Sequence, residues 1–295
     1  MPRTGDPSAA ELRPPTPGEL QRLLRREGLR PRHGLSQNFL TDAEALDAIL
    51  AAAELEPGDR VVEIGPGLGV LTRRLLAAGA EVIAIEIDTH LVGYLRRELD
   101  DAVGLTLVEG DALAEDPDAL FAGQPYKLVA NIPYHITSPL LHQFLGADHA
   151  PDLAVLLVQA EVAQRVAAAP GGMSYLSAFV QDLAEAEVVT RVPAAAFEPA
   201  PDVDSAILRL TRRPTSLVPR DARETFHRLT QAAFRQRRKQ IHNSLVRELP
   251  LTREQVVGAL ATCAVTPDRR PQTLSVPEWA CLTDALRLTL EAADA

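Results

Sequence analysis

A short stretch, NIPYHITSPLL (131–141), brings an amide, a rigid backbone and an aromatic ring together directly after an apolar segment, KLVA (127–130). Proline lacks a backbone donor and fixes φ, so a predicted strand should end here. Asn131 offers a hydrogen-bonding amide, Pro133 stiffens the backbone and Tyr134 offers a flat face for stacking. This grouping suits the binding of a planar, hydrogen-bonding ligand. A plain turn with a half-buried tyrosine is the alternative.

The second candidate site is a glycine-rich loop in VVEIGPGLGVLT (61–72), which reads as strand, Gly-x-Gly-x-Gly and helix. Glycines allow a sharp turn and close approach to a ligand, and the following helix start offers free N–H groups. The pattern alone is compatible with a dinucleotide, S-adenosylmethionine or a merely tight turn. Dinucleotide binding needs glycine or alanine where this chain has Val70, which argues against a nicotinamide-dependent oxidoreductase.

Acidic residues end the next two predicted strands. Glu86 in AIEID (84–88) stands where a carboxylate can accept hydrogen bonds from both ribose hydroxyls of a nucleoside, and Asp111 in EGDAL (109–113) can bind an adenine amino group. Each acid alone is better explained as a solvated carboxylate at a strand end. Ligands bind at the carboxyl ends of parallel strands, so Glu86, Asp111 and Asn131 on three strand ends predict one nucleoside site.

Alternating strands and helices must position these residues. Strands are predicted at 60–64, 81–87, 105–110, 126–131, 152–159, 187–192 and 205–210. This pattern predicts an α/β fold with a seven-stranded, mostly parallel sheet. The strand pattern stops after residue 211, and helices are predicted over 221–248, 252–263 and 275–291.

The chain of 295 residues is long enough for about two domains. We predict an N-terminal arm over 1–29, a catalytic domain over 30–211 and a small all-helical domain over 212–295. The proline-rich start of the arm is typical of disorder, and residues 19–28 fit a short basic helix.

Composition narrows the class of protein. No apolar run is long enough to span a bilayer and no export signal is evident, so we expect a cytoplasmic protein without membrane association. Cys263 and Cys281 belong to no metal-binding pattern, so we expect small core residues of a cytosolic protein and no metal site. A monomer is the default expectation.

Charge is distributed unevenly along the chain. The net charge is −10, yet residues 205–247 carry eleven basic and two acidic residues, and residues 1–33 carry seven basic and four acidic ones. The rest of the chain is therefore strongly acidic. Local charge decides phosphate binding, so either basic segment is a candidate for contact with nucleic acid, and two solvated faces are the alternative.

The chain resembles the class I S-adenosylmethionine-dependent ribosomal RNA adenine dimethyltransferases. The likeness covers roughly residues 30–290 and follows the family's motif order. Besides the stretches quoted above, it is carried by LSQNFL (35–40), QAEVAQRVAA (159–168), FEPAPDVDSAILRL (197–210) and FRQRRKQIHNSL (234–245). Within the family the chain is most similar to bacterial enzymes that dimethylate two adjacent adenosines near the 3′ end of 16S rRNA.

The resemblance implies a Rossmann-like domain that binds S-adenosylmethionine and methylates N6 of adenosine. It implies cofactor binding by Asn38, Leu40, Glu63, Gly65, Gly67, Glu86, Asp111, Ala112 and Asn131. The Asn131 oxygen and the Ile132 carbonyl, held by Pro133, are expected to accept hydrogen bonds from N6. Tyr134 should stack on the flipped base. Phe197 is a candidate for the opposite face, although a core position explains it equally well.

The implied partner is 16S rRNA in the 30S subunit. Its phosphates are expected to contact a basic helix in the second domain, where RQRRK (235–239) would put Arg235, Arg238 and Lys239 near one face beside Arg228.

Two other functions remain open. The sister family that methylates 23S rRNA and confers antibiotic resistance shares the glycine loop, the acids and the Asn-x-Pro-Tyr motif. A 30S assembly factor, for which binding matters more than methylation, is the second alternative.

Overall fold

The computed structural model describes residues 12–32 and 37–294, and the chain divides into two compact units. The first unit comprises Met1–Ala163 and Glu187–Arg212, and the second comprises Gln164–Ala186 and Arg213–Ala295. The second unit thus takes in residues 164–186 as well as the C-terminal helices. The sequence-based boundaries at residues 29 and 211 stay predictions.

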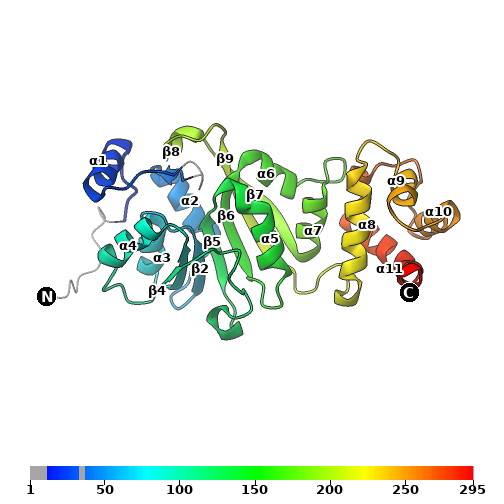
Figure 1. Ribbon diagram of the computed structural model, residues 1–295, viewed down its shortest axis with the longest axis horizontal. Helices are drawn as coiled ribbons and strands as arrows, with labels where there is room; N and C mark the ends of the chain where they lie inside the picture. Colours follow the sequence, from blue (N-terminus) through cyan, green and yellow to red (C-terminus); the bar gives the residue numbers. More distant parts are fainter. Residues whose placement is uncertain (1–11, 33–36, 295) are drawn as a thin grey trace. The chain divides into compact units, whose positions relative to one another are not determined.

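The central sheet has seven strands in the order β4-β3-β2-β5-β6-β9-β7 (Figure 1). Its strands are β2 (Arg60–Ile64), β3 (Glu81–Glu86), β4 (Leu105–Glu109), β5 (Lys127–Asn131), β6 (Leu153–Gln159), β7 (Ala184–Val192) and β9 (Ser205–Arg212). Neighbouring strands from β4 to β6 are parallel, whereas β9 runs antiparallel to β6. The predicted seven-stranded, mostly parallel sheet is confirmed. The carboxyl ends of β2 to β5 therefore meet at one edge.

Helices cover the inner strands of the sheet, such as β2 and β6, which are apolar on both faces. In β6, six of seven residues are buried, as expected for an inner strand. Leu46, Ile49 and Leu75 pack with Val129 and Val155 in one core. The helices that follow or flank these strands are α2 (Ala43–Ala53), α3 (Val70–Ala77), α4 (Thr89–Glu98), α5 (Thr137–Gly146) and α6 (Ala160–Val166).

The N-terminal segment contributes a docked helix, α1 (Pro17–Glu27), which confirms the short helix predicted near the start of the chain. Thr16 and Glu19 form a capping box at its start, and Gly28 ends it with φ 67°. Its buried face carries Leu20 and Leu24. Residues 1–11, which include most of the proline-rich start, lie outside the described residues.

A small two-stranded sheet pairs distant parts of the first unit. Strand β1 (Phe39–Leu40) runs antiparallel to β8 (Phe197–Glu198). The Thr41 N–H and hydroxyl both donate to the Ala196 carbonyl, at 2.8 and 3.0 Å. The sequence does not predict this sheet, since two-residue strands carry no periodic signal.

The second unit is helical. Its helices are α7 (Tyr175–Leu183), α8 (Arg223–Arg235), α9 (Ile241–Glu248), α10 (Arg253–Thr262) and α11 (Val276–Asp294). They enclose one core in which Phe226, Leu229, Ile241 and Trp279 are fully buried. The predicted C-terminal helical region is confirmed.

The single helix predicted over 221–248 is wrong, because residues 236–240 form a turn between α8 and α9. Gln236 leaves helical geometry with φ −115° and ψ 42°. The Ile241 N–H then donates to the Arg269 carbonyl at 2.7 Å. A tertiary hydrogen bond has replaced the helical one.

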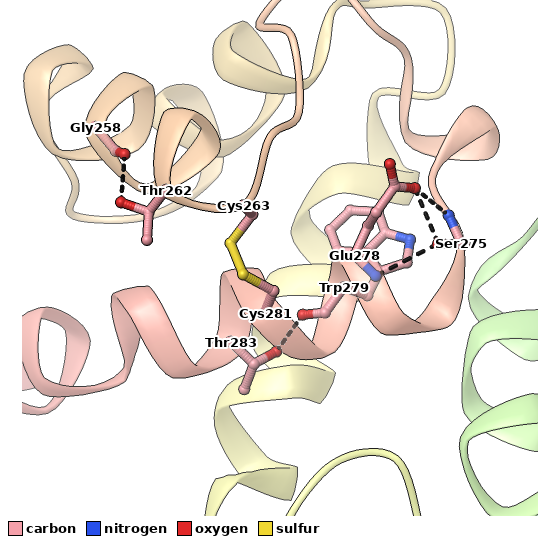
Figure 2. Close-up of a disulfide and its surroundings, with 8 residues drawn as sticks. All are labelled: Gly258, Thr262, Cys263, Ser275, Glu278, Trp279, Cys281 and Thr283. Carbon is pink, nitrogen blue, oxygen red and sulfur yellow. Dashed lines mark hydrogen bonds between the residues drawn. A yellow bond between two sulfur atoms is a disulfide. The ribbon is translucent and has the colours of Figure 1, made fainter.

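The expectation of two unpaired core cysteines is also wrong. Cys263, just after α10, forms a disulfide with Cys281 in α11, with Cα atoms 5.8 Å apart (Figure 2). The two cysteines come together only when α10 and α11 pack, so their spacing of 18 residues in the sequence does not predict the disulfide. The disulfide links two helices of the second unit.

Across the described ranges, no helix combines the length and the apolar character needed to cross a membrane.

Candidate active site

A pocket lies at the sheet edge where β2 to β5 end. The structure brings together here all the residues predicted to bind a cofactor and all the predicted catalytic residues except Phe197. The predicted residues that line it are Asn38, Leu40, Glu63, Gly65, Gly67, Glu86, Asp111, Ala112, Asn131, Ile132, Pro133 and Tyr134.

The glycine loop between β2 and α3 forms one wall of this pocket. Gly65 and Gly67 have φ of 67° and 59°, in the left-handed region that favours glycine. A Cβ on Gly67 would also lie 3.3 Å from the Phe39 ring. The Gly65 N–H donates to the Ile85 carbonyl at 2.9 Å and fixes the loop to β3. The loop therefore presents bare backbone to the pocket.

Glu86, the last residue of β3, is a buried carboxylate in the pocket wall. It accepts hydrogen bonds from the Gly67 N–H at 3.1 Å and the Asp88 N–H at 2.9 Å. Burial raises the pKa of this carboxyl, although both backbone donors oppose the shift. These bonds orient Glu86 and couple it to the glycine loop, so it is a fixed acceptor for ligand hydroxyls.

Glu63, in the middle of the β2 wall, is only 1% exposed. Thr72 donates its hydroxyl to this carboxyl at 2.7 Å. Burial, with a smaller contribution from the nearby Glu86, raises the Glu63 pKa to about 8, although the hydrogen bond from Thr72 opposes the shift. Glu63 is therefore mainly protonated at neutral pH and can act as a hydrogen-bond donor as well as an acceptor.

The turn after β4 carries Asp111 and Ala112. The Asp111 carboxylate accepts from the Leu113 N–H at 2.9 Å, which shapes the turn. Gln143 in α5 donates its amide to the Ala112 carbonyl at 3.2 Å. Gln143 carries no signal in the sequence, because only the fold brings α5 beside this turn.

Asn131 ends β5 and faces the β1 side of the pocket. Its amide NH₂ donates to the Asn38 carbonyl at 3.3 Å. This bond fixes the amide orientation, so the side-chain oxygen remains an acceptor. The next residue, Ile132, is held by its N–H, which donates to the Leu157 carbonyl at 3.2 Å.

Tyr134 is anchored through its hydroxyl. That hydroxyl and the Ser205 hydroxyl lie 2.7 Å apart in a hydrogen bond. Ser205 begins β9 and is fully buried. Burial raises the pKa of Tyr134, so its hydroxyl is neutral. Ser205 is a missed site residue, although it belongs to the FEPAPDVDSAILRL stretch.

Phe197 does not line the pocket. It is 2% exposed, lies in β8 and pairs in register with Leu40. Its ring belongs to the hydrophobic core of the first unit. A stacking role for Phe197 stays a prediction.

The four predicted RNA-binding residues belong to the second unit. Arg228 lies within α8, Arg235 is its last residue, and Arg238 and Lys239 follow on the exposed turn. The expected placement of Arg235, Arg238 and Lys239 on one helical face is therefore wrong. Arg235 is also paired with Glu248 at 3.6 Å.

Comparison with known proteins identifies a family. The family model described as "Ribosomal RNA adenine dimethylase" matches residues 28–282. A relative from Moorella thermoacetica named "Ribosomal RNA small subunit methyltransferase A" is 44% identical over 92% of this chain and 98% of its own length. A relative of the same name from Pelotomaculum thermopropionicum is 41% identical, covering 92% and 96%.

Solved structures agree with this likeness. The 23S rRNA methyltransferase ErmE has a TM-score of 0.68 and 32% identity, covering 85% of this chain and all of its own. A dimethyladenosine transferase from Plasmodium falciparum has a TM-score of 0.72 and 26% identity, covering 84% and 97%.

Proposed function

The chain belongs to the ribosomal RNA adenine dimethylase family, and on that premise we propose that it dimethylates N6 of two adjacent adenosines near the 3′ end of 16S rRNA. The observation that carries this proposal is a single pocket in which Asn131 to Tyr134 stand beside the glycine loop and Glu86. Relatives named for the small ribosomal subunit, at 39–44% identity, support the choice of 16S rRNA.

The pocket fits S-adenosylmethionine as the methyl donor. Glu86 is a buried, oriented carboxylate suited to ribose hydroxyls, and the backbone at Gly65 and Gly67 leaves room for close approach. Asp111 is suited to the adenine amino group. When bound, this cofactor supplies a methyl group on a cationic sulfur, which is a strong electrophile.

The protein's task is to prepare a poor nucleophile. The N6 lone pair of adenosine is delocalised into the ring, so acceptors for its two N–H groups favour a pyramidal amine. The Asn131 side-chain oxygen and the Ile132 carbonyl are the acceptors we assign to this role. Both are positioned in advance by the hydrogen bonds to Asn38 and Leu157.

The base itself must leave its RNA structure to enter the pocket. We assign the stacking face to Tyr134, whose ring is held by the bond to Ser205. Exposed cations on the 236–240 turn of the second unit, Arg238 and Lys239, are suited to phosphates of the same RNA. Because ribosomes are assembled in the cytoplasm, we expect the enzyme to act there on the 30S subunit.

The test is transfer of labelled methyl from S-adenosylmethionine to 30S particles that lack the modification, followed by nucleoside analysis. Wild-type protein should give dimethyladenosine in 16S rRNA. Asn131→Ala should lose at least about a hundredfold in rate, because the N6 amine is no longer oriented. Cofactor binding by the variant should be measured alongside, to separate loss of chemistry from loss of the pocket.

The 23S rRNA alternative is favoured by the ErmE structure, at 32% identity. Offering 50S particles in parallel distinguishes the two, since label in 23S rRNA would overturn our assignment. An assembly factor would instead bind 30S particles without methyl transfer, and Asn131→Ala would still restore their maturation.

A further inference from the structure

The docked N-terminal helix α1 lies at the rim of the pocket. Leu20 and Leu24 pack against Leu91, Tyr94 and, in the glycine loop itself, Leu68. Just before the helix, Pro15 lines the pocket. The segment that carries α1 therefore borders the pocket proposed to receive the base.

Polar contacts also hold this segment in place. Gln21 donates to the Glu198 carboxylate at 3.0 Å, and Glu27 accepts from Arg97 at 3.1 Å. Arg32 pairs with Asp88 at 3.4 Å. The segment is thus attached to α4 and to β8 as well as to the glycine loop.

Three arginines of this segment take no part in these contacts. Arg22, Arg25 and Arg30 are exposed, and none of their side chains forms an ion pair or hydrogen bond with another residue that the structure describes. By helical spacing, Arg22 lies on the face of α1 opposite Leu20 and Leu24, and Arg25 lies on the flank between these faces. The buried face docks the helix, and the outer face carries unneutralised charge.

A groove runs beside two of these side chains, those of Arg25 and Arg30. Arg25, Arg30 and Pro31 line it from the α1 side. Glu198, whose carboxylate accepts the bond from Gln21, lines it too, so the groove holds two guanidinium groups against one carboxylate. Guanidinium groups bind phosphate oxygens bidentately, and a row of them tracks a nucleic-acid backbone.

We propose that Arg22, Arg25 and Arg30 form a second RNA-backbone surface, on the first unit, that holds the phosphates flanking the target adenosine. This rests on the proposed function. The proposed surface goes beyond that function, because two of its three arginines, Arg22 and Arg25, lie outside residues 28–282, which the family model matches. The surface would guide the strand to the pocket rim independently of the cations in the second unit.

The test compares two triple variants of the full-length protein. One is Arg22→Gln, Arg25→Gln and Arg30→Gln. The matched control is Arg60→Gln, Arg96→Gln and Arg191→Gln, which removes the same charge from ion-paired arginines of the first unit that are partly or fully exposed. Binding to a protein-free 3′-terminal fragment of 16S rRNA and to 30S particles is measured over a salt series, with cofactor binding in parallel.

We expect the first variant to bind the RNA fragment at least about tenfold more weakly, with a salt slope smaller by about 2, and to bind cofactor normally. The control should change little. Equal losses in both variants, or no loss in either, would overturn the surface. A loss seen with 30S particles but not with free RNA would indicate a protein contact and overturn it too. If the wild type binds neither substrate, the proposed function itself fails.

Discussion

The hydrogen bond between Tyr134 and Ser205 fixes the far end of the ring that we propose stacks on the target base. A tyrosine ring that only stacks could rotate about its side-chain bonds. Its hydroxyl is instead fixed at 2.7 Å to a serine that is fully buried at the start of β9. In the proposed function Ser205 is therefore a positioning residue, which would act on the substrate only through Tyr134.

This role predicts a non-additive pair of variants. Ser205→Ala and Tyr134→Phe each remove the bond, and we expect each to lower the methyl-transfer rate about threefold to tenfold, the net value of one hydrogen bond. Ser205→Ala should add nothing in a Tyr134→Phe background, and Ser205→Thr should restore activity. Ser244→Ala is the control, since Ser244 is equally buried and bonds to the Gln240 carbonyl. Additive losses would exclude the coupling.

The protonation state of Glu63 gives a prediction about stability. Its pKa of about 8 in the folded chain lies above the unfolded value of about 4.3. Between these values the folded state binds more protons than the unfolded state, so stability falls as pH rises through the window. Glu63→Gln, which stays neutral, should lessen that fall by up to about 1.4 kcal/mol per pH unit.

The measurement is the free energy of urea unfolding across that window. Glu44→Gln, at an exposed position in α2, should leave the pH dependence unchanged. A Glu63→Gln variant that keeps the wild-type slope would mean that Glu63 is ionised in the folded protein.

Site residues that lie at the carboxyl end of a strand, or directly after it, could be predicted from the sequence. Glu86, Asp111 and Asn131 meet in one pocket because parallel strands end at one edge. Gln143 and Ser205 could not be predicted as site residues, since their roles depend on hydrogen bonds between elements that are distant in the chain.

At the scale of elements, the turn at 236–240 means that the basic side chains of residues 235–239 do not share one helical face. Phe234 and Ile241 are both core residues and are spaced as on one continuous helix, which is why the sequence predicts no break. The break frees the intervening side chains from a helical face. Arg237, which the sequence analysis did not single out, is as exposed there as Arg238 and Lys239.

The turn predicts unequal effects of charge removal. Arg238→Gln with Lys239→Gln should weaken binding to 16S rRNA and reduce the salt slope by about 1 to 2, because both cations are exposed for phosphate contact. Arg235→Gln should cost less, because Arg235 is already paired with Glu248. Filter binding over a salt series measures both. Equal effects of the two variants would argue against the turn geometry, and unchanged cofactor binding is the control.

At the scale of the whole molecule, unfolding of each of the two units can be followed by its own signal. Trp279 is the chain's only tryptophan and is fully buried in the core of the second unit. The candidate cofactor pocket belongs to the first unit. Tryptophan fluorescence therefore follows unfolding of the second unit, and cofactor binding follows the first.

These probes allow the contribution of the disulfide to be measured. The bond between Cys263 and Cys281 closes a loop of 18 residues, which restricts the unfolded chain and should stabilise the second unit by about 3 kcal/mol. Reduction, or Cys263→Ser with Cys281→Ser, should move the fluorescence midpoint in urea to lower concentration. Cofactor binding by the reduced or substituted protein should match that of the oxidised wild type at the same urea concentrations. A fluorescence midpoint that does not change on reduction would mean that the disulfide adds nothing to the stability of the second unit. Parallel shifts in fluorescence and in cofactor binding would mean that the two units unfold together.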